Sequence, residues 1–150
     1  MKTFDTIKYL QSLCDNLLHE CEDHRIELTR AWASNFPSQP GVYVFRDKTK
    51  IIYVGETGNL RGRMKDMIDT RNHVLRRNIG NKLYNTVKGF EPATARRKFI
   101  DVIEDMLNTH IKENLTICCM TIGLGRKELE EKIQKDFNPE YNQKGLRKTS

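Results

Sequence analysis

The stretch from residue 41 to residue 63 reads GVYVFRDKTKIIYVGETGNLRGR. It contains two runs rich in β-branched and aromatic residues, 41–46 and 50–55, on either side of a short polar segment at 47–49. Two such runs separated by a few polar residues are typical of a β-hairpin. We therefore predict two antiparallel strands at the centre of the fold.

The expected register of this hairpin brings two tyrosines together. If Arg46 faces Lys50, then Tyr43 lies directly opposite Tyr53, and both side chains point to the same face of the sheet. A shift of one residue in the register would break this pairing. The hairpin thus predicts a pair of neighbouring phenol groups on one face.

Four helices are expected on the C-terminal side of the hairpin. Asn59 can cap a helix that begins at Leu60. A short helix over about 73–79 is expected to end at Gly80, and a longer one is expected to open at Glu91-Pro92 and to run to Ile111. Apolar residues at helical spacing also predict a final helix over 126–136, after the glycines at 123 and 125.

The remaining elements complete the predicted fold. Apolar residues from Ile7 to Leu28 recur every three or four positions, which predicts an amphipathic N-terminal helix. Residues 115–122 are rich in β-forming residues and are predicted to form a third strand. The fold class is therefore α/β, with a small, mainly antiparallel three-stranded sheet flanked by helices. We expect a helical extension over 1–36, a domain over 37–143 and a basic tail over 144–150.

Length and composition fit one globular domain. The chain has 150 residues, of which 37% are hydrophobic and 31% are charged. No apolar run approaches the ~20 residues that a membrane span needs. The first residues lack the apolar core of a secretory signal, so a cytoplasmic location is expected.

The net charge of +6 is concentrated in one segment. Residues 58–98 contain eleven Lys and Arg against three Asp and Glu, a local excess of +8. A concentrated positive charge attracts polyanions such as nucleic acids, mostly without reading their sequence. The alternative is an ordinary solvated helical surface.

The four cysteines do not predict a disulfide framework. Cys14 and Cys21 lie two turns apart on the expected N-terminal helix, too far for a bridge. Cys118 and Cys119 are adjacent in an expected strand and point to opposite faces. The chain contains no CxxC pair, so we expect reduced thiols and no structural zinc site.

Five sequence pieces in a fixed order carry a family resemblance. They are Gly41-Val42-Tyr43, Tyr53-Val54-Gly55, Arg63, Glu130 and the ending Pro139-Glu140-Tyr141-Asn142. Nine residues separate the two tyrosines, Arg63 follows Gly55 by eight positions, and Glu130 precedes Pro139 by nine. This series resembles the GIY-YIG nucleases, small α/β domains that hydrolyse DNA phosphodiesters with one divalent metal.

The resemblance implies an endonuclease that uses Mg²⁺ or Mn²⁺. Tyr43 would activate a water molecule with support from Tyr53, and Arg63 would bind the scissile phosphate. Glu130 would hold the metal, and Asn142 would close the motif. Helical spacing supports Glu130 over its acidic neighbours, because it borders the apolar side marked by Leu129, whereas Glu128 and Glu131 turn further away.

The sequence departs from the family pattern at two places. Many family members carry a lysine or histidine just after the second tyrosine or one turn beyond the arginine, where this chain has Glu56 and Met67. His73 could take over the missing helper role, or it could simply cap the helix that follows. The helper of the general base stays open at this point.

The basic segment would bind the nucleic-acid backbone. The candidate phosphate-binding residues are Arg61, Lys65, Arg71, Arg76, Arg77, Lys82, Arg96 and Arg97. A homodimer would explain cleavage of both strands by a domain with one site. The length favours a stand-alone nuclease over the excision-repair subunit of the family. The alternatives are an inactive nucleic-acid-binding module and an interaction subunit that recruits a partner through its N-terminal helix.

Overall fold

The computed structural model describes residues 3–142, and within this range it contains one four-stranded antiparallel sheet. The strands are β1 (His24–Arg25), β2 (Gly41–Asp47), β3 (Lys50–Thr57) and β4 (Leu115–Thr121), in the order β1-β4-β2-β3. The predicted α/β class is confirmed. The predicted strand number is wrong, because β1 has only two residues and is too short to show an alternating pattern.

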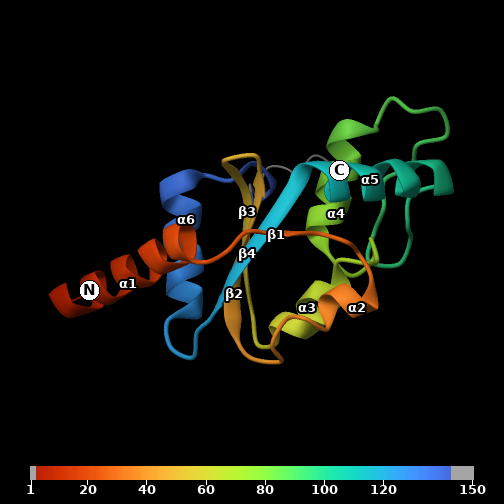
Figure 1. Cartoon of the computed structure of the whole chain (residues 1–150). Helices are drawn as coiled ribbons and strands as arrows, with labels where there is room; N and C mark the ends of the chain where they lie inside the picture. The colour runs from red at the N-terminus through yellow and green to blue at the C-terminus, as the bar shows by residue number, and fades with distance from the viewer. Residues whose placement is uncertain (1–2, 143–150) are drawn as a thin grey trace.

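Helices cover both faces of the sheet (Figure 1). On one side lie α1 (Phe4–Asp15) and α6 (Arg126–Phe137). On the other side lie α2 (Arg30–Ala33), α3 (Leu60–Asp66), α4 (Val74–Leu83) and α5 (Asp101–Asn114). A π-helical turn, η1 (Asn16–Glu20), extends α1, and a 3₁₀ turn, η2 (Glu140–Asn142), follows α6.

The alternation of side chains along β2 and β3 divides the core into two layers. Val42, Val44 and Val54 pack with residues of α1 and α6. Tyr43 and Tyr53 face the opposite way and pack with residues of α3, α4 and α5. Because strand residues alternate between faces, both tyrosines belong to the same layer.

The register of the hairpin differs from the predicted one. Two changes shift the pairing by one residue each: Asp47, and not Arg46, faces Lys50 at the turn, and a β-bulge lies between Phe45 and Arg46. Tyr53 therefore faces Phe45, and Tyr43 faces Gly55. The two tyrosines lie on the same face, as predicted. They are diagonal neighbours, however, and not directly opposite each other as predicted. A bulge adds one unpaired residue to a strand, which a continuous apolar run in the sequence does not reveal.

The N-terminal helix is shorter than its apolar pattern predicts. It ends after Glu20, and Cys21 is already extended. Residues 24 and 25 then pair with Ile117 and Thr116 of β4. Leu28, which continues the helical spacing in the sequence, has a φ of 59° and cannot extend a helix. Strand pairing with β4 therefore overrides the helical pattern here.

The predicted boundary between α4 and α5 is also wrong. α5 begins at Asp101 and not at Glu91, and Arg96, Arg97 and Lys98 lie in a loop. The Phe99 backbone N–H donates to Glu104 Oε2 at 3.0 Å, which fixes the start of α5. α4 continues past Gly80 to Leu83. The glycine is needed for packing, because a Cβ at this position would be 2.2 Å from the Phe99 ring.

Other predictions are confirmed. Asn59 caps α3 by accepting a hydrogen bond from the Gly62 backbone N–H at 3.2 Å. β4 and α6 lie within one residue of their predicted ends. All four cysteines are free thiols. Within residues 3–142, none of the helices is long and apolar enough to cross a membrane. The predicted tail over 144–150 lies outside the described residues.

Candidate active site at the edge of the sheet

Tyr43 lies across the neighbouring strand in a space that only a glycine provides. A Cβ atom at Gly55 would be 2.4 Å from the Tyr43 ring and from its hydroxyl oxygen. The side chain is 1% exposed, and its hydroxyl lies over Gly55 of β3, the last strand of the sheet. The glycine of the Tyr-Val-Gly piece therefore allows a tyrosine of the inner strand to place its hydroxyl at the sheet edge.

Two donors converge on the Tyr43 hydroxyl oxygen. Arg63 Nε donates to it at 3.2 Å, and His73 Nε2 lies 3.1 Å away. His73 Nδ1 accepts the backbone N–H of Leu75 at 3.1 Å, so in the neutral ring the proton is on Nε2. By this assignment of the tautomer, His73 donates to Tyr43, and the Tyr43 proton points away from both donors.

Burial keeps Tyr43 and His73 neutral. It raises the pKa of Tyr43, as does the nearby Tyr53, whereas Arg63 opposes the rise. Burial also lowers the pKa of His73 well below 6.5, with additional repulsion from Arg63, Arg77 and Arg76. The sequence left two roles open for His73, a helix cap and a helper of the general base. His73 does cap α4, and it also contacts Tyr43, which a helper would need to do.

Tyr53 completes the aromatic layer next to Tyr43. Its ring centroid lies 6.2 Å from that of Tyr43 and 5.6 Å from that of His73. The Phe45 ring lies 6.3 Å from both Tyr53 and His73. The Tyr43 ring itself also lies 5.7 Å from the Phe45 ring and 6.0 Å from the His73 ring, and these contacts together fix the position of its hydroxyl.

Arg63 is fixed by three acceptors. Besides Tyr43, its guanidinium donates through Nη1 to Asp66 Oδ2 and to the backbone carbonyl of Asn72, both at 3.1 Å. The side chain is 27% exposed and is therefore accessible to a ligand. Its position in the first turns of α3 follows from the cap at Asn59.

Glu130 and Asn142 both bind the free edge of β3. Asn142 Oδ1 accepts the Val54 N–H at 2.8 Å, and Asn142 Nδ2 donates to the Val54 carbonyl at 2.9 Å. Two residues further along the strand, the backbone N–H of Glu56 donates to the Glu130 carboxylate. Outward-pointing backbone groups recur at every second residue of an edge strand, which explains this spacing.

The Glu130 carboxylate is half-buried and belongs to the same electrostatic environment as Tyr43. Burial raises the pKa of Glu130, the charge of Glu56 raises it further, and the hydrogen bond from the Glu56 backbone lowers it. The charge of Glu130 in turn contributes to the raised pKa of Tyr43. The structure thus brings Tyr43, Tyr53, Arg63, His73 and Glu130 to one region of the sheet edge.

The two positions that depart from the family pattern have different surroundings. Met67 is fully buried in the core. Glu56 forms an ion pair with Arg126 at 3.4 Å, and Arg126 also donates to the backbone carbonyl of Thr57. The sequence analysis missed Arg126, although its place at the start of α6, one turn before Glu130, could have drawn attention to it.

The predicted phosphate-binding residues do not form one group. Arg76 is 1% exposed, and its guanidinium binds Glu104, Thr70, Asn108 and the Met67 carbonyl. Its predicted contact with nucleic acid is therefore wrong. Arg77 is half-buried beside Arg63.

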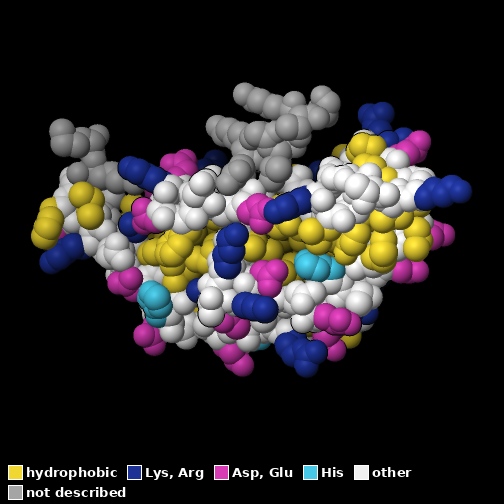
Figure 2. Space-filling view, turned by 90° about the horizontal axis from the view of Figure 1, so that it is seen from above, with side chains coloured by type: hydrophobic (Ala, Val, Ile, Leu, Met, Phe, Trp, Pro, Cys, Tyr) yellow, Lys and Arg dark blue, Asp and Glu magenta, His cyan; other side chains and the backbone are white. Residues whose placement is uncertain are grey.

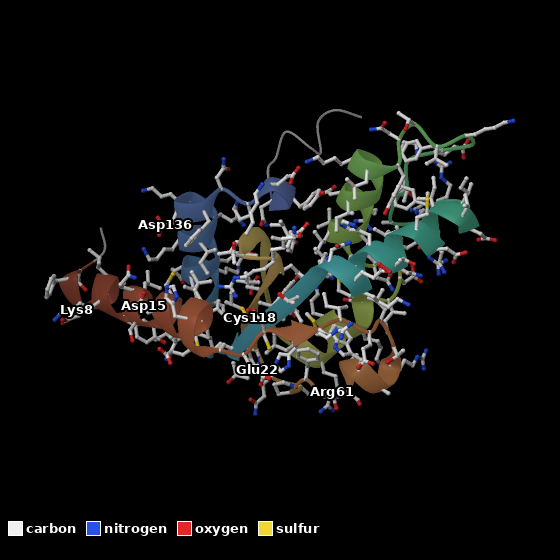
Figure 3. All side chains as sticks on the ribbon, turned by 45° about the horizontal axis from the view of Figure 1, so that its top comes forward. Lys8, Asp15, Glu22, Arg61, Cys118 and Asp136 are labelled. Atoms are coloured by element: carbon white, nitrogen blue, oxygen red, sulfur yellow. The ribbon has the colours of Figure 1, made fainter. Side chains whose placement is uncertain are left out.

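The other six residues lie at the surface or at its margin, and several have partners. Arg61 Nε donates to the Phe36 carbonyl at 2.8 Å. Figure 3 shows Arg61 by α2 and α3, on the other side of the sheet from Lys8 and Asp136.

Three of these surface residues form ion pairs: Arg71 with Asp69, Lys82 with Glu140 and Arg97 with Glu91. Lys65 and Arg96 are exposed. On the face shown in Figure 2, basic and acidic side chains alternate around a hydrophobic band.

The donor set at the sheet edge suits a cation that prefers oxygen ligands, such as Mg²⁺ or Mn²⁺. Within residues 3–142, there is no group of three or more His, Cys, Asp or Glu that could enclose a metal. Magnesium keeps several water ligands and needs only one or two carboxylates from the protein. The half-buried carboxylate of Glu130 satisfies this requirement.

Comparison with known proteins supports the resemblance. No family model matches the chain. The UvrABC system protein C of Corynebacterium jeikeium (strain K411) is 30% identical over 114 residues, which cover 62% of this chain and 16% of that protein. The chain therefore spans about a sixth of the length of this relative.

Among solved structures, the chain is similar to the GIY-YIG N-terminal endonuclease domain of UvrC from Thermotoga maritima. The form bound to magnesium is 20% identical and aligns over 76% of this chain and 94% of that chain, with a TM-score of 0.41. A point mutant bound to its catalytic divalent cation is 21% identical over 77% and 94% of the two chains, with a TM-score of 0.39.

Proposed function

We propose that this chain is a GIY-YIG-type endonuclease domain that hydrolyses DNA phosphodiester bonds with a divalent metal ion. The observation that carries this proposal is the convergence of Arg63 and His73 on the Tyr43 hydroxyl, at the edge where β3 also binds Glu130. A phenol held by two donors next to a carboxylate can serve proton transfer and charge stabilisation at one phosphate.

Tyr43 is the group that activates water. After its own proton has passed to bulk water, the Tyr43 phenolate would accept a proton from the attacking water, whose oxygen forms a bond to phosphorus as the bond to the sugar oxygen breaks. The leaving alkoxide then takes up a proton from water. Burial disfavours the phenolate, whereas the hydrogen bonds from Arg63 and His73 favour it. Tyr53 holds the Tyr43 ring in place.

Arg63 binds the scissile phosphate. Its guanidinium stays charged at all relevant pH values and presents several donors in a plane, which suits phosphate oxygens. Asp66 and the Asn72 carbonyl hold it in position before a ligand arrives, which lowers the entropy cost of binding.

His73 is the helper that the family pattern leaves open. Because its Nδ1 is engaged by the Leu75 N–H, its role is to donate a hydrogen bond through Nε2 and not to take a proton. A donor at this position stabilises the negative charge that Tyr43 carries when it is deprotonated. Asn142 holds β3, on which Tyr53 and Gly55 lie.

Glu130 would hold the metal ion, and its hydrogen bond with the Glu56 backbone orients the carboxylate. A bound Mg²⁺ or Mn²⁺ supplies positive charge that stabilises the developing negative charge on the phosphate and leaving oxygens. The half-buried position of Glu130 excludes part of the water that would otherwise screen this interaction.

The test compares metal-dependent cleavage by the parent protein and by two glutamate variants. Supercoiled plasmid and single-stranded DNA are incubated with Mg²⁺ or Mn²⁺, and metal binding is measured separately by calorimetry. Glu130→Ala should abolish cleavage and weaken metal binding while DNA binding is kept. Glu131→Ala removes an exposed carboxylate of the same helix and should leave both unchanged.

Other outcomes point to the alternatives. Salt-sensitive DNA binding without cleavage by the parent protein would favour an inactive binding module. The loss of activity would then agree with Glu56 and Met67 standing where many family members carry a lysine or histidine. Neither binding nor cleavage would favour an interaction subunit. Deletion of residues 1–35 would then abolish partner recruitment. Sedimentation of the protein with and without DNA tests the proposed homodimer.

A further inference from the structure

A second arginine is attached to the same loop as Arg63. The backbone carbonyls of Thr70 and Arg71 accept hydrogen bonds from Arg77 Nη1 at 3.1 and 2.8 Å. The next carbonyl, that of Asn72, accepts from Arg63 Nη1 at 3.1 Å. Three successive carbonyls between α3 and α4 thus hold two guanidinium groups side by side.

The same segment connects Arg77 with the Tyr43 site. His73 follows these carbonyls directly in the chain and binds the Tyr43 hydroxyl. His73 is the N-cap of α4, Arg77 lies four residues further on in the first turns of this helix, and the charge of Arg77 contributes to the lowered pKa of His73. Tyr53 contributes to the electrostatic environment of Arg77 as well as that of Arg63.

Arg77 differs from its basic neighbours in how its charge is compensated. Arg63, Arg71 and Arg76 form ion pairs with Asp66, Asp69 and Glu104. Over the described range, 3–142, Arg77 forms no ion pair and has only carbonyl acceptors. Burial lowers its pKa, and the neighbouring charge of Arg63 lowers it further.

The hydrogen bonds of Arg77 leave part of its guanidinium group unused by the loop. Both bonds come from Nη1, so they use neither Nη2 nor Nε. Two like charges held together by backbone carbonyls repel each other, and an anion bound between them would relieve the repulsion. The residue thus has the charge, the fixed position and the donors that an anion-binding group needs.

We propose that Arg77 is a second phosphate-binding residue of the candidate active site, which together with Arg63 contacts a phosphodiester of the bound strand. This inference rests on the proposed nuclease function and specifies how its substrate backbone is held. The proposal gives Arg77 a role that the buried Arg76 and the surface-exposed basic residues of 58–98 do not have.

The first test is DNA binding in EDTA, where metal-dependent cleavage cannot occur. A short fluorescein-labelled duplex is titrated at several salt concentrations. Arg77→Gln should weaken binding about tenfold and reduce the salt slope by about one unit, as expected for the loss of one phosphate contact. The control, Arg30→Gln, removes the same charge from an exposed position of α2 and should change neither quantity.

The variant could also act by loosening the loop that carries His73, and a second measurement on the unaltered protein separates the two effects. The Nε–H resonances of Arg63 and Arg77 are followed by NMR during titration with the same duplex. Shifts of both resonances support the inference. A shift of Arg63 alone would overturn it, as would an unchanged salt slope in Arg77→Gln.

The outcome for Arg77 is distinguishable from that for the nuclease proposal. If the parent protein cleaves DNA but Arg77→Gln binds DNA with normal affinity and slope, the function stands and this inference fails. If the parent protein binds DNA through both arginines but does not cleave it, the proposed chemistry fails while the phosphate contact remains.

Discussion

Asn142 binds Val54 through both of its side-chain polar atoms and thereby replaces a missing neighbouring strand. Its Oδ1 accepts from the Val54 N–H at 2.8 Å, and its Nδ2 donates to the Val54 carbonyl at 2.9 Å. Val54 lies between Tyr53 and Gly55, so the last described residue of the chain holds the strand segment that carries the candidate site.

Replacement of Asn142 by alanine should destabilise the protein, because Val54 would lose both hydrogen-bonding partners. We expect a loss of about 1–3 kcal/mol in the free energy of unfolding, measured by urea titration. Amide exchange at Val54 should become faster. Asn35→Ala, at an exposed position, serves as the control, and an equally large effect there would contradict the assignment.

Gly55→Ala should displace Tyr43. The added methyl group would be 2.4 Å from the Tyr43 ring and hydroxyl, so the ring must move or the strands must separate. We expect a destabilisation of about 1–3 kcal/mol together with loss of nuclease activity. Gly123→Ala, where a Cβ would have no neighbour within 4 Å, should retain both, and activity in Gly55→Ala would show that the position of Tyr43 is not essential.

His73 should make the protein less stable in acid. Its pKa is lowered in the folded state from an ordinary value of 6.5, so below that pH the unfolded chain binds a proton that the folded chain does not. The contribution of neutral His73 to the free energy of unfolding is therefore fully present above about pH 6.5. It is lost as the pH decreases below that value, by up to about 1.4 kcal/mol per pH unit.

Urea titrations at pH 7.5 and pH 5.5 test this dependence. His73→Gln should show a smaller difference between the two conditions than the parent protein. His110→Gln, which alters a histidine near the surface of α5, should keep the difference of the parent. Equal pH dependence in all three proteins would show that His73 protonates in the folded state as readily as in the unfolded chain.

Arg76→Met should be strongly destabilising, in contrast to an ordinary surface arginine. The substitution leaves Glu104 without its cationic partner, and loss of one member of a buried pair typically costs about 3–5 kcal/mol. The double variant Arg76→Met with Glu104→Gln should recover part of the loss in thermal unfolding. No recovery would indicate that packing, and not charge, determines the effect.

The sequence predicts those parts of the fold that depend on local patterns. Runs of β-branched and aromatic residues identify β2 and β3, and the Asn59 cap identifies the start of α3. The two-residue strand β1 and the bulge at Phe45 leave no such pattern, because both depend on pairing between distant segments. The late start of α5 is fixed by the hydrogen bond from the Phe99 N–H to Glu104, which apolar spacing alone does not indicate.

The candidate site shows a similar division. The motif spacing identifies Tyr43, Arg63 and Glu130, which the structure brings to one region. Charge counting alone does not distinguish Arg76 from Arg77, although one is buried against Glu104 and the other lies beside Arg63. The difference arises from the direction of adjacent side chains on α4, which depends on what packs around this helix.

The contacts on β3 have a consequence for the behaviour of the protein in solution. An edge strand with unpaired backbone groups is a template for adding a strand from another molecule, which leads to aggregation. Asn142 and Glu130 occupy the outward-pointing groups at Val54 and Glu56. The residues that organise the candidate site therefore also shield this edge, and we expect selection for catalysis and selection for solubility to act on the same two side chains.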